Sequence, residues 1–124
     1  MTPSWDQLLT AARDEVAATL EALPEELHAA AAKVPVIYQK RPDPRLVEEG
    51  LDPDLLGLFV GDSRTEGEPG TAVPSQILLF LENLWAFAEE DWGFYAEEVE
   101  VTFLHELGHY LGLEEEDLED RGLE

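Results

Sequence analysis

The sequence predicts an α+β fold in which a small mixed β-sheet packs on helices, within one domain that covers residues 1–124. Two long segments near the ends carry apolar residues at helical spacing, and three short β-branched or apolar runs lie between them. Apolar residue types make up 44% of the 124 residues, which is enough for one core. Any active site must therefore use the same few elements that build this core.

The N-terminal segment carries the signals of a helix start. Ser4 suits the N-cap position, and Gln7 follows three residues later, as in a capping box. Because Pro24 interrupts the pattern, we expect a first helix over residues 5–22 and a short second helix from Pro24 through Ala32. The first helix has apolar residues at helical spacing: Leu8, Leu9, Ala12, Val16 and Leu20.

Three short runs, residues 34–38, 55–60 and 75–81, are expected to be strands. Pro35 favours an edge position for the first strand, because proline cannot donate a hydrogen bond to a neighbouring strand. We expect the second run to pair with the first. The third run is apolar on both faces and should be well buried.

The segments between these runs are rich in proline, glycine and charge. They predict loops over residues 41–54 and 61–74, whereas residues 82–90 suit a short helix. Beyond a long helix over residues 92–111, Gly112 can end that helix and a short acidic helix or tail should follow over residues 114–120.

We expect other parts of the chain to pack against two faces of the long helix. One face carries Val99, Phe103, Leu107 and Leu111 at four-residue steps. The nearly opposite face carries Val101, His105 and His109. We therefore expect this helix to lie centrally in the fold.

The composition restricts the class of partner. There are 29 acidic and 7 basic residues, giving a net charge of −22, so nucleic acid is a poor partner, anionic membranes are disfavoured, and we expect neither as a partner. A basic or neutral partner is easier to accommodate, although the charge also serves simple solubility. Without cysteine, neither disulfides nor thiolate metal ligands can form. Because there is neither a signal sequence nor an apolar run long enough to span a bilayer, we expect a cytoplasmic protein.

The pattern H-E-x-x-H occurs on the long helix, at His105, Glu106 and His109. Residues four apart project from the same side of a helix, so both imidazoles can bind one metal ion. Glu106 points about 100° away around the helix axis, beside the metal rather than on it. There it can take a proton from water activated by the ion. In a chain of this length, the pattern arises by chance less than about once in a hundred times.

A catalytic zinc ion needs a third protein ligand and an open position for water. His28 is distant in sequence and has the features of an ordinary helix-surface residue. Gly112 allows a sharp turn that can bring the acidic cluster back toward the ion. The spacing H-E-x-x-H-x-x-G-x-x-E selects Glu115 as the third ligand. The other residues of the cluster remain alternatives: Glu114, Glu116 and Asp117.

The segment from His105 to Leu118, which follows a strand and a short helix, resembles the small bacterial zincin-like metallopeptidases, or minimal zincins. The resemblance extends loosely over most of the chain, including the N-terminal helix and the Leu55–Phe59 strand after a proline-rich loop. It implies a compact α+β fold, a zinc site and peptidase activity. Two features of larger relatives are missing. Met1 is the sole methionine, so no Met-turn exists, and no later His or Lys supplies a further electrophile.

These observations predict a zinc metallopeptidase that acts on peptides or proteins, with Zn²⁺ held by His105, His109 and Glu115 and with Glu106 as general base. The substrate would lie along a sheet edge as an added strand. Tyr95 and Tyr110 could donate a hydrogen bond to the tetrahedral intermediate, but the position of Tyr110 favours a core role. The alternative is a non-catalytic metal-binding module whose acidic surface binds a basic partner. Hydrolysis of another amide or of an ester also stays open.

Overall fold

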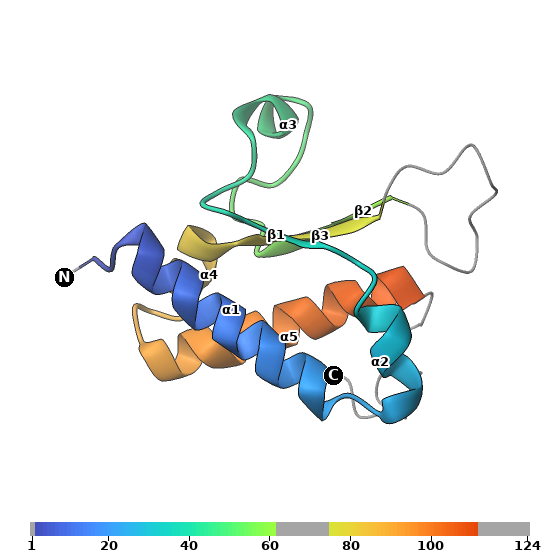
Figure 1. The fold of residues 1–124 in the computed structure, drawn as a ribbon. Coiled ribbons are helices and arrows are strands. Elements are labelled where there is room, and N and C mark those ends of the chain that lie inside the picture. The colour runs from blue at the N-terminus through green and yellow to red at the C-terminus, as the bar shows by residue number, and fades with distance from the viewer. Residues whose placement is uncertain (1, 62–74, 112–124) are drawn as a thin grey trace.

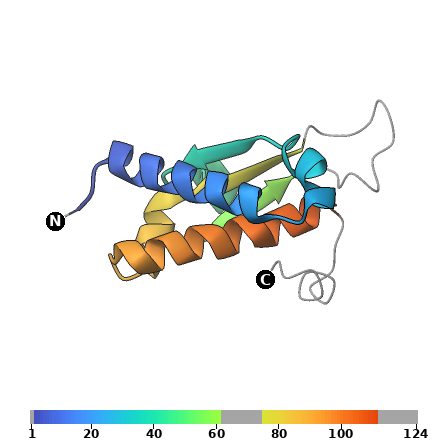
Figure 2. The same ribbon diagram turned by 60° about the horizontal axis from the view of Figure 1, so that its bottom comes forward.

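The computed structural model describes residues 2–61 and 75–111 of the chain, which form an α+β fold. A small sheet lies over one side of a layer made by two long helices, α1 and α5, which run side by side (Figures 1 and 2). The predicted fold class is therefore confirmed. The elements are α1 (Trp5–Ala22), α2 (Glu25–Ala31), β1 (Val36–Gln39), α3 (Pro44–Glu48), β2 (Gly57–Val60), β3 (Gln76–Phe80), α4 (Leu81–Phe87) and α5 (Trp92–Leu111).

The start of α1 is fixed by the capping box that the sequence predicts. The Gln7 backbone N–H donates to the Ser4 hydroxyl oxygen at 3.2 Å, and the Ser4 backbone N–H donates to Gln7 Oε1 at 2.9 Å. The helix ends before Pro24, and α2 starts directly after that proline. Both predicted N-terminal helices are thus present, within one or two residues of their expected bounds.

The strand order in the sheet is β1-β3-β2, with β1 parallel and β2 antiparallel to the central strand β3. The expectation that the second run pairs with the first is wrong, because β3 lies between them. β3 is the most apolar of the three strands, and the centre of the sheet buries Ile77 and Leu79 completely. β1 is an outer strand, as Pro35 indicates.

The predicted loop over residues 41–54 contains a short helix, α3, which corrects the sequence interpretation. Asp43 is its N-cap and accepts a hydrogen bond at 2.9 Å from the backbone N–H of Arg45, while Pro44 occupies the first turn. An Asp-Pro pair starts a helix as readily as it interrupts one. The sequence interpretation treated the prolines of this segment as breakers alone.

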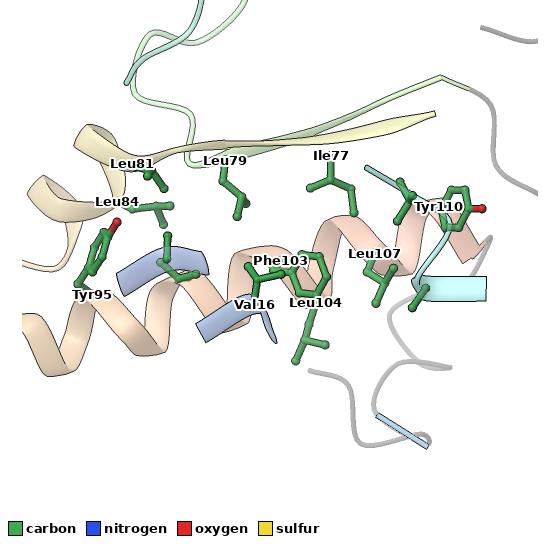
Figure 3. Close-up of a cluster of buried hydrophobic side chains, with 14 of the residues drawn as sticks. Val16, Ile77, Leu79, Leu81, Leu84, Tyr95, Phe103, Leu104, Leu107 and Tyr110 are labelled. Carbon is green, nitrogen blue, oxygen red and sulfur yellow. The ribbon is translucent and has the colours of Figure 1, made fainter. Parts of the chain in front are cut away.

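The core lies between the sheet and the two long helices. Ile77 and Leu79 point from β3 toward α5, where Phe103 and Leu107 meet them (Figure 3). α5 contacts α1, α2, α4, β2 and β3, so its central position is confirmed. Its second face is not covered as expected, because Val101 is 46% exposed and both motif histidines are exposed. Neither the sheet nor α1 covers that face.

Three expectations lie outside the described residues: the loop over residues 62–74, the helix end at Gly112 and the acidic segment over residues 114–120. Within residues 2–61 and 75–111, no helix combines the length and apolar character needed to cross a membrane. The cytoplasmic location stays a prediction.

Candidate metal centre

The site lies near the C-terminal end of α5. His105, Glu106 and His109 each offer one ligand atom, and these atoms all lie within 4.8 Å of one another. The two histidines are exposed, whereas Glu106 is half-buried. The helix itself produces this arrangement, because positions i and i+4 are neighbours on one face.

The two histidine rings are oriented so that both can bind one metal ion. Their Nε2 atoms are 3.3 Å apart, and the rings stand at 86° to each other with centroids 4.9 Å apart. In a tetrahedral zinc centre with Zn–N bonds of 2.0–2.1 Å, the separation between two bound nitrogens is about 3.3–3.4 Å. The observed spacing therefore fits two nitrogen ligands of one zinc ion, and imidazole nitrogen is a common zinc ligand.

Glu106 faces a different neighbour from the histidines. Thr102, Glu106 and Tyr110 follow one another at four-residue steps, so they share the side of α5 that β2 covers. A Cβ built on Gly57 of β2 would lie 2.5 Å from Thr102 Cγ2. At the other end of this row, the Phe59 ring of β2 meets the Tyr110 ring edge-on at 6.1 Å. Glu106 thus sits between two points where β2 contacts the helix.

The close approach of Gly57 to α5 was not predicted from the sequence, although the sequence contains a signal for it. Gly57 interrupts an apolar run between Leu56 and Leu58. A glycine inside a strand often marks a place where another part of the chain comes close. Here that part is Thr102, one helical turn before Glu106, so Gly57 sets the distance between β2 and the site helix.

The two tyrosines considered as hydrogen-bond donors are core residues. Tyr110 is 9% exposed and packs on Phe59, as its predicted core role requires. The Tyr95 hydroxyl donates to the Leu8 carbonyl oxygen at 2.8 Å, and burial raises the pKa of this tyrosine above its ordinary value. Ten residues of helix, or about 15 Å, separate Tyr95 from His105, so the suggested catalytic role of Tyr95 is wrong.

The remaining candidate ligands are His28 and the acidic cluster after α5. His28 is exposed near the end of α2 and is not part of the His105, Glu106 and His109 group, which agrees with a surface role. The predicted third ligand, Glu115, lies outside the described residues, as do its alternatives. Its assignment stays a prediction.

An α+β fold with H-E-x-x-H on a core helix, two histidine nitrogens at zinc-ligand spacing and a carboxylate beside them is the arrangement typical of a zincin-type centre. Residues 31–123 match the model of the zincin-like metallopeptidase family, and the chain belongs to that family. No curated protein matches the chain. Family and site together support a metallopeptidase-type function, with peptides or proteins as the substrates that the family implies.

Proposed function

We propose that this protein is a zinc-dependent peptidase in which His105 and His109 bind the metal and Glu106 is the general base. The observation that carries the proposal is the 3.3 Å separation of the two Nε2 atoms, with the Glu106 carboxylate in the same group of ligand atoms. A purely structural zinc site does not need a carboxylate next to its ligands. Glu115 is proposed as the third ligand on its sequence spacing.

When bound, zinc supplies Lewis-acid chemistry that polarises a peptide carbonyl and makes water more acidic. The Glu106 carboxylate accepts a proton from the water whose oxygen attacks the carbonyl carbon. The same carboxyl group then gives this proton to the nitrogen of the leaving amine as the C–N bond breaks. Glu106 therefore ends the cycle in its starting ionisation state. Its half-buried position beside β2 limits the directions in which the carboxylate can move.

The proposed substrate position is the free side of β2. β2 is an outer strand that pairs with β3 through one of its edges. It runs along the site helix, from Thr102 near Gly57 to Tyr110 near Phe59. A peptide that adds to this edge as a further strand would pass beside Glu106.

The first experiment measures metal content and turnover together. Protein purified without chelator or metal-affinity resin should contain about one zinc per chain. Glu106→Gln should keep that zinc and lose peptide hydrolysis by about 100-fold or more, since general base catalysis contributes about 10²–10⁴-fold. Glu97→Gln is the matched control, because Glu97 is an exposed glutamate on the same helix. Full hydrolysis by Glu106→Gln would show that the proposed mechanism is wrong.

The alternative function, a non-catalytic metal-binding module, is favoured by one observation. Both histidines lie on an exposed helix face of a chain with a net charge of −22, which suits contact with a basic protein. Zinc binding without hydrolysis of any peptide, amide or ester would favour this module. Measurable turnover that disappears in Glu106→Gln would reject it.

A further inference from the structure

Most of the large exposed apolar side chains that the structure describes belong to α4 or to α5, the helix that carries the metal centre. Scattered exposed apolar residues need no explanation, but a contiguous group marks an interaction surface. Among the described residues, four of the six large apolar side chains that are exposed belong to α4 or α5. These four are Phe87 at 60%, Trp92 at 45%, Phe94 at 56% and Val101 at 46% exposure.

Two of these side chains line a hollow at the beginning of α5. Its apolar lining residues are Phe87, Ala88 and Phe94, and Glu89 and Glu98 border it. Its volume is about 210 Å³. Pockets for whole small-molecule ligands measure about 300–1,000 Å³, so this hollow suits a single large side chain of a polypeptide.

A row of positions on one face of α5, exposed except for the half-buried Glu98, connects the hollow with the metal centre. Phe94, Glu98, Val101 and His105 follow one another at steps of four, three and four residues, which keeps them on one helix face. Eleven residues of helix span about 16 Å. An extended polypeptide covers that distance in about five residues.

The acidic residues near this row of positions favour a basic polypeptide as the partner. Glu89 and Glu98 border the hollow, and Glu90 and Asp91, which follow Glu89 in the chain, are exposed. Residues 81–111 contain no Lys or Arg. An acidic segment would be repelled, and a second copy of this chain, with its net charge of −22, is disfavoured for the same reason. Basic residues next to a large apolar side chain complement the surface.

We propose that the hollow between Phe87 and Phe94 is a specificity pocket of the peptidase. It takes a large apolar side chain that lies about five residues from the cleaved bond and is flanked by Lys or Arg. The substrate class is therefore unfolded basic polypeptide, of which the segment between the pocket and the metal centre lies along the exposed face of α5 and the segment at the cleaved bond lies beside β2. This inference rests on the proposed peptidase function for its account of cleavage, but the binding that it describes can be measured separately.

Cleavage is tested with 14-residue peptides that each carry one Phe and two adjacent Lys in an Ala-Ser background. Mass spectrometry should locate the cleaved bonds about five residues from the Phe. Phe94→Ser should raise KM by about tenfold or more with little change in kcat, because it removes apolar contact far from the reacting bond. Phe87→Ser should do the same. Leu46→Ser is the matched control, since Leu46 is 43% exposed but lies on α3.

Binding is tested without turnover, by fluorescence anisotropy of the labelled peptides on zinc-loaded Glu106→Gln protein. Affinity should fall about tenfold when Phe94→Ser is added, or when the two Lys of the peptide become Glu. If the cleaved bonds do not depend on the position of the Phe and KM is unchanged in Phe94→Ser, the proposed specificity pocket is wrong, whereas the peptidase function stands. Absence of any cleavage, with peptide binding that still depends on Phe94, would overturn the peptidase function instead. Self-association that is lost in Phe94→Ser would show that a second copy occupies the hollow, and would also overturn the inference.

Discussion

The two faces of α5 carry side chains of similar helical spacing but opposite exposure. Val99, Phe103 and Leu107 are completely buried between the sheet and α1, whereas His105 and His109, on the opposite face, are exposed. The helical repeat places these two sets within two residues of each other along the chain and on different sides of the axis. Stability and metal chemistry should therefore depend on different residues of one helix, and each set can be changed with little effect on the other.

The strongest test of this separation compares one residue from each face. Phe103→Ala should lower the free energy of unfolding by about 3–5 kcal/mol, because it leaves a cavity in the core. That is a large part of the roughly 5–15 kcal/mol typical of a domain. His109→Ala should change the stability of the metal-free protein by less than about 0.5 kcal/mol and abolish stoichiometric zinc binding. Urea unfolding and metal titration check both. Equal destabilisation by the two changes would contradict the separation.

Substitutions where β2 approaches a third side of α5 should lower the stability of the protein less than Phe103→Ala and more than His109→Ala. A Cβ on Gly57 would lie 2.5 Å from Thr102 Cγ2 and 3.2 Å from the Leu78 carbonyl oxygen. Gly57→Ala should therefore destabilise the protein by about 1–3 kcal/mol through overpacking. Thr102→Ser removes the Cγ2 methyl group and should restore part of this loss in the double variant, as a double-mutant cycle would measure. Additive effects of the two changes would show that the contact does not limit the approach of β2.

Local features of the chain could be predicted from sequence with good accuracy. The capping box at Ser4, the beginning of α5 at Trp92 and the grouping of His105, Glu106 and His109 depend on neighbours within one or two helical turns. Such features can be recognised from the spacing of residues in the sequence.

Features that depend on distant parts of the chain were predicted less well. The place of β3 between β1 and β2 reflects how much apolar surface each strand buries, which neighbouring residues do not determine. The exposure of the histidine face likewise depends on which elements pack against α5. The five-residue helix α3 has no buried residue, so no apolar periodicity marked it.

Where α5 faces α1, a substitution should change the free energy of unfolding less than Gly57→Ala does, but this change should depend on pH. Burial is the largest cause that raises the pKa of Glu15 above 4.5, and a hydrogen bond and the like charge of Glu100 on α5 raise it further. Between its ordinary and its raised pKa, Glu15 binds more protons in the folded state than in the unfolded state. Stability should therefore fall as the pH rises through this window and stay lower at neutral pH.

Glu15→Gln should accordingly stabilise the protein at pH 7, by less than about 1 kcal/mol because the pair is partly solvated, and should flatten the pH profile just above pH 4.5. Thermal unfolding between pH 4 and pH 7 measures both effects. Glu21→Gln on the same helix is the control, since Glu21 is exposed and the change removes the same charge from a chain of net charge −22. If Glu21→Gln gave the same gain and the same flattened profile, general charge repulsion would explain the result, and the contact between Glu15 and Glu100 would have no part in it.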